Sequence, residues 1–430
     1  MTTSSGAALR RIQIGNALSA FGNGFTVPYT FLYISQVRGL GSTTAGIGLA
    51  GFAVAALLVL PLVGRIIDER GPMRVAVVGA VAAGIGAFSL GQSSSVPFVI
   101  ASTAVMGAGI SVIQPALATM IVWCSSAVSR SRAFATQFFL NNLGLGIGGL
   151  LGGLIVRGSE VSSFTMLFCI ESVMVVVLAV VVGTTRLPLA PEVAGARPGA
   201  DGAGRWRALL GDRAMVLLGV LGFVMFFACY GQFESGLSAF AVEVSGISPA
   251  TLGVALAANT AVIVVAQFIV LRMVERRRRS RVIAVVGLIW SLAWVMAAAS
   301  GWIAGSQAMA TAAIISTYAL FGVGEAMLSP TVAPLVADLA PASMVGQYNS
   351  AFALVKQLAL AVGPAVGGLL AGAGAYGFYI GMLVVFSLGI SVMGLVLGRR
   401  LTAAQDSPRG RSLVVRAGPE PVASAALAEH

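Results

Sequence analysis

Four ionisable side chains lie within long apolar stretches of the sequence. Three are the carboxylates Glu171, Glu234 and Glu325, and the fourth is Lys356, the single lysine among 26 basic residues. A charge at the centre of a bilayer costs about 2.5–3.5 kcal/mol or more, so such residues are candidates for function. A buried carboxylate can bind a proton, and a buried lysine loses its charge more readily than an arginine. The chemistry to consider is therefore proton transfer or the binding of a charged molecule.

Glu325 and Lys356 are expected at similar depths. Glu325 lies about ten residues before the end of its apolar stretch, and Lys356 about nine residues after the start of the next. At 1.5 Å per helical residue, these positions are about 15 Å and 14 Å from the same membrane surface. Three interpretations remain open. The two residues form a static ion pair, or Glu325 binds a proton while Lys356 adjusts it, or Lys356 binds an anionic substrate.

These residues must be positioned by membrane helices. The chain is 57% hydrophobic and only 10% charged, which is more apolar than a soluble core requires. Its apolar stretches reach the roughly 20 residues that a spanning helix needs, and they are continuous rather than alternating, which excludes a barrel. We predict an all-α integral membrane protein with 12 transmembrane helices, at residues 12–36, 43–64, 75–92, 97–123, 134–156, 162–184, 215–241, 249–271, 282–304, 309–335, 347–372 and 376–398.

The positive charge follows membrane topology. With a cytoplasmic N-terminus, all arginines except Arg38 and Arg157 fall on cytoplasmic segments. The positive-inside rule then predicts a multi-pass protein with both termini in the cytoplasm. The near-exclusive use of arginine is typical of a GC-rich bacterium, so the bacterial inner membrane is the expected location. The run "ERRRRSR" at residues 275–281 can contact anionic lipids, and no nucleic acid is expected.

The chain reads as two copies of a six-helix unit. "VMGAGISVIQP" at residues 105–115 aligns with "LFGVGEAMLSP" at 320–330, with glycines and a proline in register. Such parallel duplication is typical of transporters whose halves are related by a pseudo-twofold axis along the membrane normal, with the substrate between them. We predict an N-terminal six-helix bundle at residues 1–184, a cytoplasmic linker at 185–213, a C-terminal six-helix bundle at 214–400 and a disordered cytoplasmic tail at 401–430.

The loop "GRIIDERGPMR" at residues 64–74 resembles the signature of the major facilitator superfamily. Glycines permit a tight turn, and acidic and basic side chains can form a breakable charge network. The resemblance implies that this network latches the cytoplasmic face of one half against the other. The residues at the signature positions are Gly64, Asp68, Gly71 and Arg74, with Glu275 and Arg281 as the counterparts of Asp68 and Arg74 in the second half.

Two glycine-rich stretches are similar to the superfamily's antiporter motif, which ends Gly-Pro-x-x-Gly-Gly. In "GLGIGGLLGG" the residues Gly148, Gly152 and Gly153 match, while Gly149 replaces the proline. The full form stands in the second half as Gly363, Pro364, Gly367 and Gly368. Small residues at this spacing let helices pack closely. The resemblance implies proton-coupled export, although Thr103 replaces the arginine of a third signature, so another group must bind the proton.

The resemblance covers about residues 10–400 and implies that helices 1, 4, 7 and 10 line a central cavity. Glu234 and Glu325 would both face it, as in exporters of lipophilic cations. Helix 6 usually lies outside the bundle, so Glu171 is expected at a packing interface or extending to the membrane surface. The other expected proton- or substrate-binding residues are Asn23, Tyr29, Gln114, Asn141, Tyr230 and Gln357, with Asn16, Tyr33, Asn142 and Asn259 as further lining groups.

The sequence therefore predicts a secondary transporter that exports small lipophilic compounds, cations among them, by proton antiport with rocking halves. One alternative is uptake or facilitated transport of a metabolite or organic anion with Lys356 as counter-ion. Another is a transporter-like sensor or a lipid-processing enzyme, but the sequence has no polar catalytic cluster. It also has no ATP-binding loop and no metal-ligand spacing, so no ATP, metal or other cofactor is expected. We expect a monomer whose partners are the substrate, protons and membrane lipids.

Overall fold

The computed structural model describes residues 3–158, 160–188, 202–233, 235–302 and 306–407, and within them it has helices and no strands. The first bundle contains α1 (Thr3–Thr26), α2 (Thr30–Leu32), the π-helix η1 (Tyr33–Val37), α3 (Gly41–Arg70), α4 (Pro72–Gly91), α5 (Val96–Cys124), α6 (Arg130–Ile155) and α7 (Val161–Gly183). Helix α8 (Gly202–Gly211) connects it to the second bundle. That bundle contains α9 (Arg213–Ala228), η2 (Tyr230–Gln232), α10 (Gly236–Glu243), α11 (Pro249–Val274), α12 (Arg279–Trp302), α13 (Gln307–Leu328), α14 (Val332–Leu339), η3 (Ala342–Met344), α15 (Val345–Gly372) and α16 (Tyr376–Gly398), followed by α17 (Ala403–Asp406).

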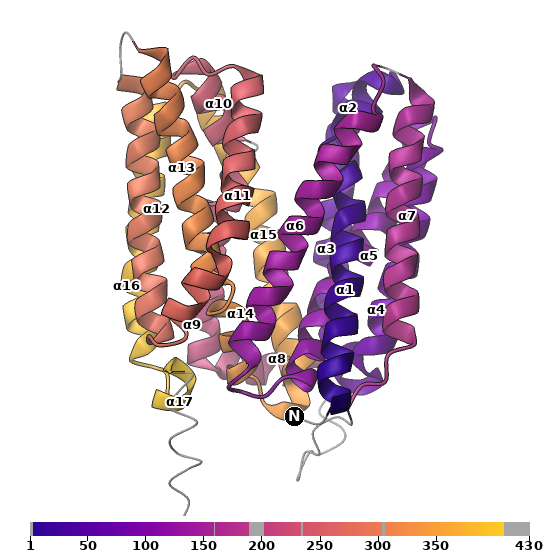
Figure 1. Cartoon of the computed structure of the whole chain (residues 1–430), viewed down its shortest axis with the longest axis vertical. Coiled ribbons are helices and arrows are strands. Elements are labelled where there is room, and N and C mark those ends of the chain that lie inside the picture. The colour runs from indigo at the N-terminus through magenta and orange to yellow at the C-terminus, as the bar shows by residue number, and fades with distance from the viewer. Residues whose placement is uncertain (1–2, 159, 189–201, 234, 303–305, 408–430) are drawn as a thin grey trace, which may run out of the picture.

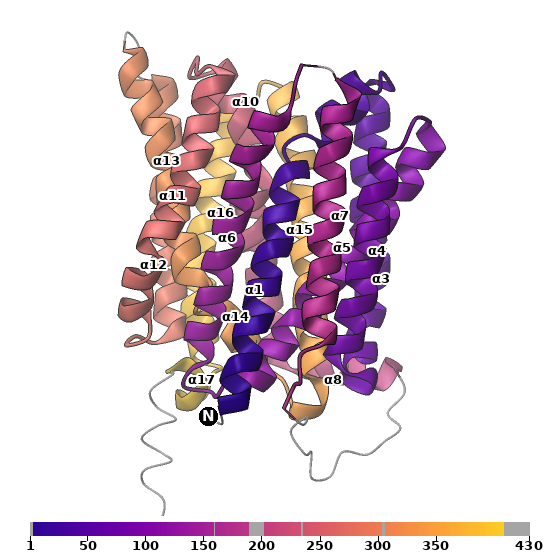
Figure 2. The ribbon, with the colours of Figure 1, turned by 45° about the vertical axis from the view of Figure 1, so that its right-hand side comes forward.

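Eleven helical segments of the described chain are long and apolar enough to cross a membrane. The predicted first helix corresponds to α1 with α2 and η1 beyond it, and α1 is the least apolar of the long helices because it includes Arg10, Arg11, Gln13 and Asn16. It nevertheless runs beside α6 and α7 through most of the height of the first bundle (Figure 2).

The helix pairing of the first bundle recurs in the second. In the first, α1 packs on α6, α3 on α5, and α4 on both α5 and α7. In the second, α9 packs on α15, α11 on α13, and α12 on both α13 and α16. These are the same pairs when the two sets of six helices are counted in chain order. The predicted duplication is therefore present in the packing as well as in the sequence.

The two bundles converge at the end where the N-terminus lies and diverge toward the other end (Figure 1). We call the converging end the basic face, because α3 ends there at Arg70 and α6, α9 and α12 begin there at Arg130, Arg213 and Arg279. We call the other end the opposite face. Contacts between the bundles run along α3 with α15 and along α6 with α11.

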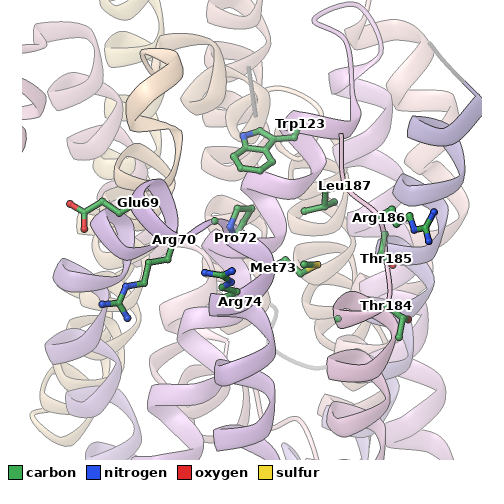
Figure 3. Close-up of a pocket in the computed structure, with 12 residues that line it drawn as sticks. Glu69, Arg70, Pro72, Met73, Arg74, Trp123, Thr184, Thr185, Arg186 and Leu187 are labelled. Carbon is green, nitrogen blue, oxygen red and sulfur yellow. The ribbon is translucent and has the colours of Figure 1, made fainter. Parts of the chain in front are cut away.

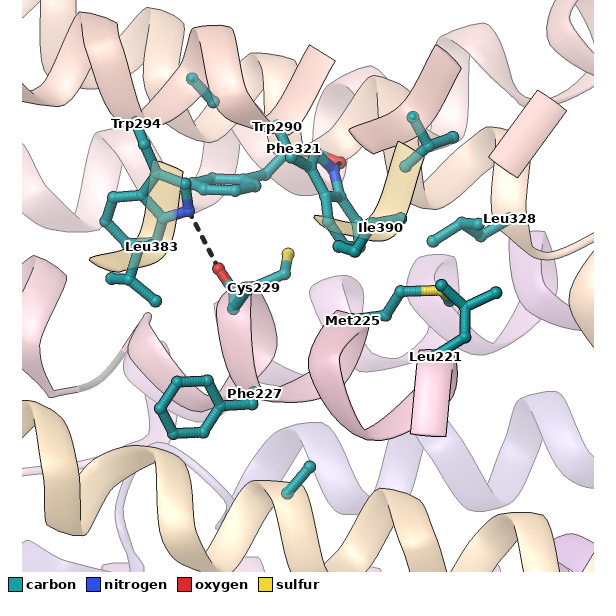
Figure 4. Close-up of a cluster of buried hydrophobic side chains, with 14 of the residues drawn as sticks. Leu221, Met225, Phe227, Cys229, Trp290, Trp294, Phe321, Leu328, Leu383 and Ile390 are labelled. Carbon is teal, nitrogen blue, oxygen red and sulfur yellow. Dashed lines mark hydrogen bonds between the residues drawn. The ribbon is translucent and has the colours of Figure 1, made fainter. Parts of the chain in front are cut away.

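The predicted helix at residues 215–241 is broken in its middle. Helix α9 ends at Ala228, and Cys229 leaves the helical region with φ −120° and ψ −84°. The carbonyl oxygens freed by the break are bonded by side chains: Trp294 Nε1 donates to Ala228 O at 3.0 Å (Figure 4) and Gln232 Nε2 to Phe227 O at 2.9 Å. Such compensation is what permits a broken helix inside a membrane protein.

A buried aromatic cluster fixes α13 in the second bundle (Figure 4). Trp290 and Trp294 of α12 are fully buried, and both rings meet the edge or face of Phe321 with centroids 6.0 Å and 5.2 Å away. Trp290 Nε1 also donates to Phe321 O at 3.3 Å. Aromatic contacts of this kind add directional preference to apolar packing. They set the rotation of α13 and hence the direction of Glu325, one turn further along.

Candidate functional site

A cavity of about 550 Å³ lies between the two bundles. Both halves contribute to its wall, with α5 and α6 on one side and η2, α13 and α15 on the other. Most of the polar residues singled out in the sequence meet here. They are Gln114, Asn141, Tyr230, Glu325, Lys356 and Gln357, together with Asn16 and Asn142.

Glu325 belongs to the cavity wall but is only 3% exposed. Asn259 Nδ2 of α11 donates to Glu325 Oε1 at 2.8 Å and also reaches Tyr318 O at 3.2 Å. The Tyr230 hydroxyl is a second hydrogen-bonding group beside this carboxylate. The arrangement holds the carboxylate in place while leaving it able to bind a proton.

Lys356 is exposed to the same cavity. Its Nζ lies 5.3 Å from the centre of the Phe226 ring, a cation–π contact, and it interacts with Glu325 electrostatically. In the described part of the chain, no carboxylate comes within ion-pair distance of this ammonium group. The expected pairing of Glu325 with Lys356 is therefore an interaction across the cavity rather than a direct ion pair.

The rest of the cavity wall is aromatic and amide-rich. Phe52 and Phe138 face it from the first half, and Phe226 and Phe352 from the second. On α1 and α6, the amides of Asn16 and Asn141 are 3.4 Å apart. A largely apolar pocket with a few convergent polar groups suits a small amphiphilic molecule.

Two of the predicted site residues that the structure describes are not part of this wall. Tyr29 packs on α6, where its hydroxyl donates to Gly149 O at 3.3 Å. Asn23 has a buried Oδ1 without a hydrogen-bond partner among the described residues. Glu234 lies outside the described residues. The polar side chains of the helix 1 region are therefore divided between the cavity, which Asn16 reaches, and the interior of the first bundle.

Glu171 lies at a packing interface, one of its two expected locations. Its side chain is 0% exposed, and the Cα of Glu171 approaches Gly22 of α1 closely. Neither carboxylate oxygen has a hydrogen-bond partner in the part of the chain that the structure describes. It does not extend to the membrane surface and does not join the cavity.

Asp68 joins the two halves at the basic face. Asp68 Oδ1 accepts from Gly346 N at 2.6 Å, and Oδ2 accepts from Gln347 N at 3.1 Å and from Arg205 Nη2 at 2.5 Å. The two backbone donors form the first turn of α15, where a negative charge is favoured by the helix dipole. Gly64 permits the approach, since a Cβ there would lie 2.7 Å from Gln347 Cα. We call this contact the α3–α15 latch.

Arg74 does not take part in the latch. The chain turns at Gly71, with φ +85°, and Arg74 then lies beside a hollow of about 700 Å³ with Arg70, Trp123 and Arg186 (Figure 3). No ion pair of Arg74 exists within the described ranges. The guanidinium group that binds Asp68 comes instead from Arg205 of α8. Nothing in the sequence distinguished Arg205 from the other arginines of the predicted linker.

A second polar contact joins the halves at the start of α6. Asp338 of α14 accepts from Arg130 Nη1 and, at 2.8 Å, from Arg279 Nη1. Beside it, the predicted Glu275 lies 3.7 Å from Arg132. The predicted Arg281 is exposed and has no ion pair in the described chain. Sequence reasoning missed Asp338, although an acidic residue just after the apolar stretch 309–335, on the side predicted to hold most arginines, was a usable signal.

An apolar layer lies between these contacts and the cavity. It consists of Ile121, Val122, Ala133 and Phe134 from the first half with Ala337 and Val345 from the second. Ser329 Oγ of the second half also donates to Phe134 O of the first, at 3.3 Å. The cavity is therefore closed toward the basic face.

The glycine motifs pack helices within each half. A Cβ at Gly148 would collide with the carbonyl of Phe21 on α1, and one at Gly363 would lie 2.7 Å from Gly231 Cα. The neighbouring motif residues behave alike, with Gly152 and Gly153 against Tyr29 and Gly367 against Gln232, whereas Gly368 has open space around it. Pro364 lies inside α15. Because η2 follows α9 in the helix that corresponds to α1, the second motif packs α15 on the counterpart of α1, as the first packs α6 on α1.

The protein-family model of the Major Facilitator Superfamily matches residues 12–314 and 243–427 of the sequence. The uncharacterized MFS-type transporter YdeE of Escherichia coli (strain K12) is 24% identical over 374 residues, which cover 82% of this chain and 86% of that protein. A multidrug resistance protein B homolog of Mycobacterium tuberculosis (strain H37Rv) is 31% identical over 98 residues, covering 22% of this chain and 18% of that protein.

Among solved structures, the Major Facilitator Superfamily transporter FucP in the outward conformation superposes with a TM-score of 0.76. The sequences are 15% identical, and the superposition covers 92% of this chain and 99% of that one. At this identity the similarity concerns the fold. Sequence and structure comparisons thus agree over nearly the whole chain.

Proposed function

Because this chain belongs to the major facilitator superfamily, we propose that it exports small lipophilic molecules across a bacterial inner membrane in exchange for protons. The observation that carries the proposal is the Glu325 carboxylate, which lies in the wall of the cavity between the halves with Asn259 bonded to one of its oxygens. An ionisable group at this depth is costly unless it serves transport or coupling. The chain lacks an ATP-binding loop, so an ion gradient is the expected energy source.

Glu325 is the proton-binding residue of the proposal. Its second oxygen is free of the Asn259 bond and can hold a proton that enters when the cavity opens. A cationic substrate and a proton would compete for this carboxylate, and such competition is what exchange requires. Tyr230 and Gln357 offer hydrogen bonds to the substrate, and the phenylalanine rings of the wall offer apolar contact.

Alternating access supplies the transport step. The halves are closed at the basic face by the α3–α15 latch, the Asp338 contacts and the apolar layer. If the basic face is cytoplasmic, as the positive-inside rule predicts, this is the state in which substrate leaves outward and protons enter. Breaking these contacts would let the halves rock and admit substrate from the cytoplasm.

Two further observations support export. The second half has the full Gly-Pro-x-x-Gly-Gly sequence at residues 363–368, and the first half makes an equivalent glycine contact. The match to a multidrug resistance protein B homolog is consistent with efflux, over 18% of that protein.

A second candidate function is the transport of a metabolite or organic anion. Lys356 is exposed to the cavity, whereas Glu325 is only 3% exposed, so an entering molecule meets the ammonium group first. An anion bound at Lys356 would be favoured when Glu325 is protonated, because the cavity would then gain a net positive charge. Proton and anion would bind together, which gives symport instead of exchange. The sign of the substrate charge therefore decides whether the substrate is exchanged for protons or transported together with them.

The test is accumulation of a fluorescent lipophilic cation in bacteria that lack their main exporters, with and without a protonophore. We expect cells with the intact protein to accumulate less dye than cells with empty vector, and the difference to vanish with the protonophore or with Glu325→Gln. The matched control is Glu160→Gln, which neutralises an exposed carboxylate at the opposite face.

Equal accumulation with intact protein and empty vector, despite confirmed membrane expression, would contradict cation export. Uptake of radiolabelled benzoate into vesicles would then test the second candidate, with Lys356→Gln as the variant that should abolish it.

A further inference from the structure

Helix α8 is attached to the second half. It leads directly into α9, and Leu209 near its end is 4% exposed within the core of that half. Asp212, which follows α8, caps α9 by accepting from Ala214 N at 3.0 Å and Met215 N at 3.1 Å. The hydroxyl of Tyr348 on α15 donates to the other oxygen of Asp212 at 3.0 Å. These bonds fix the end of α8 to α9 and α15.

Arg205 reaches from α8 to the first half. Its Nη2 donates to Asp68 Oδ2 at 2.5 Å and to Ser343 O, just before α15, at 3.0 Å. The side chains of Arg205 and Asp68 are 16% and 7% exposed, and Arg205 Nε is buried without a partner among the described residues. The guanidinium group is therefore largely removed from water where α3, α8 and the start of α15 meet.

The latch needs this positive charge in the closed state only. A desolvated carboxylate that met only the neutral N–H groups of Gly346 and Gln347 would keep an uncompensated charge. Arg205 supplies the counter-charge together with a charge-assisted hydrogen bond. In a state open at the basic face, Asp68 would be separated from these partners and would meet water instead. An interaction present in one state and absent in the other shifts the equilibrium between them.

We propose that Arg205 is a positioning residue of the transport cycle, held by α8 so that its bond to Asp68 raises the population of the state closed at the basic face. The linker between the halves thus contributes a hydrogen-bonding residue to the latch. This inference depends on alternating access, but on neither the identity of the substrate nor the coupled proton.

The experiment measures distances between spin labels in the full-length protein, reconstituted into phospholipid nanodiscs without substrate. The background variant lacks Cys124, Cys169 and Cys229. One label pair, at Val128→Cys and Arg400→Cys, reports the basic face. The other pair, at Glu160→Cys and Ala373→Cys, reports the opposite face. All four positions are exposed.

Arg205→Ala should raise the ratio of open to closed molecules at the basic face about tenfold, the effect of losing one hydrogen bond to a charged group. Arg205→Lys should restore part of the closed population, because it keeps the charge. Arg207→Ala is the matched control, since Arg207 is an exposed arginine of the same helix, and it should leave both distance distributions unchanged.

If Arg205→Ala perturbs folding, the effect of Arg205→Gln is compared with and without Asp68→Asn. In the Asp68→Asn background, Arg205→Gln should cause no further shift, because its partner charge is gone. Equal distributions for Arg205→Ala and Arg207→Ala would overturn the inference, and so would an undiminished effect of Arg205→Gln beside Asn at position 68. A protein that exports no dye but shows the expected shift would refute the proposed function alone.

Discussion

The end of α3 and the equivalent end of α11 hold the halves in different ways. Asp68, in the last turn of α3, is 7% exposed and accepts backbone hydrogen bonds from the start of α15. Its counterpart Glu275 is 22% exposed and lies 3.7 Å from Arg132, which is 69% exposed. The first contact is buried and directional, whereas the second is a surface ion pair of the kind that contributes little.

Asp338 joins the halves at the start of α6, as Asp68 joins them at the start of α15. It is 4% exposed and binds both Arg130 at the start of α6 and Arg279 at the start of α12. The start of α15 is thus held by a residue at the end of α3, and the start of α6 by a residue of α14. The duplication has preserved which helix ends meet at the basic face, while the acidic residue that joins them has changed position.

The largest effect is expected from Asp338→Asn. This substitution keeps the size of the side chain and leaves Arg279, which is 2% exposed, with the carbonyl of Gln405 as its remaining partner in the described chain. Removing one member of a buried ion pair costs about 3–5 kcal/mol. We expect a clear fall in the apparent unfolding temperature of the purified protein and an open basic face.

Glu69→Gln is the matched control for this measurement. Glu69 pairs with Arg65 on the same face, but its side chain is 45% exposed, so its loss should hardly change the unfolding temperature. Similar unfolding temperatures for Asp338→Asn and Glu69→Gln would show that Asp338 does not hold the start of α6.

Asp68→Asn should have the next largest effect. It removes the charge from hydrogen bonds to Gly346, Gln347 and Arg205, which are worth about 1.5–3 kcal/mol for a charged acceptor. The measurement is labelling of Ala118→Cys, in the cavity wall, by a thiol reagent added from the basic face. Labelling should be more than about tenfold faster in Asp68→Asn. An unchanged rate, with the protein intact, would mean that the α3–α15 latch does not control access.

The sequence was sufficient to predict most of the fold. Apolar stretches of spanning length predicted the long helices, and the repeated glycines, proline and charges predicted two bundles with equivalent packing. The break at Cys229 was not predictable, because the bonds that compensate it come from Gln232 and from Trp294 of another helix. Such side-chain bonds depend on how helices rotate against each other, which the hydropathy of a single stretch does not reveal.

The charged residues of the site were predicted, but their hydrogen-bond partners were not, because those partners also depend on how the helices pack. Glu325 and Lys356 were identifiable because a charge inside a membrane is costly wherever the helices point. That Asn259, among many amides, would bind Glu325 depends on the packing of α11 against α13. That Arg205 would bind Asp68 depends on the path of the chain across the basic face. Both facts are set by long-range geometry, so they required the structure.

The smallest effect is expected from Glu275→Gln, and this variant decides whether the two helix ends really differ. An exposed ion pair contributes about 0–1 kcal/mol, and salt weakens it further. Labelling of Ala118→Cys from the basic face should therefore change by less than about fivefold, and the change should disappear at high ionic strength. If Glu275→Gln instead speeds labelling as much as Asp68→Asn does, the duplicated helix ends are equivalent latches. The exposure of Glu275 would then belong to one stage of the transport cycle, and Asp338 would assist the end of α11 instead of replacing it.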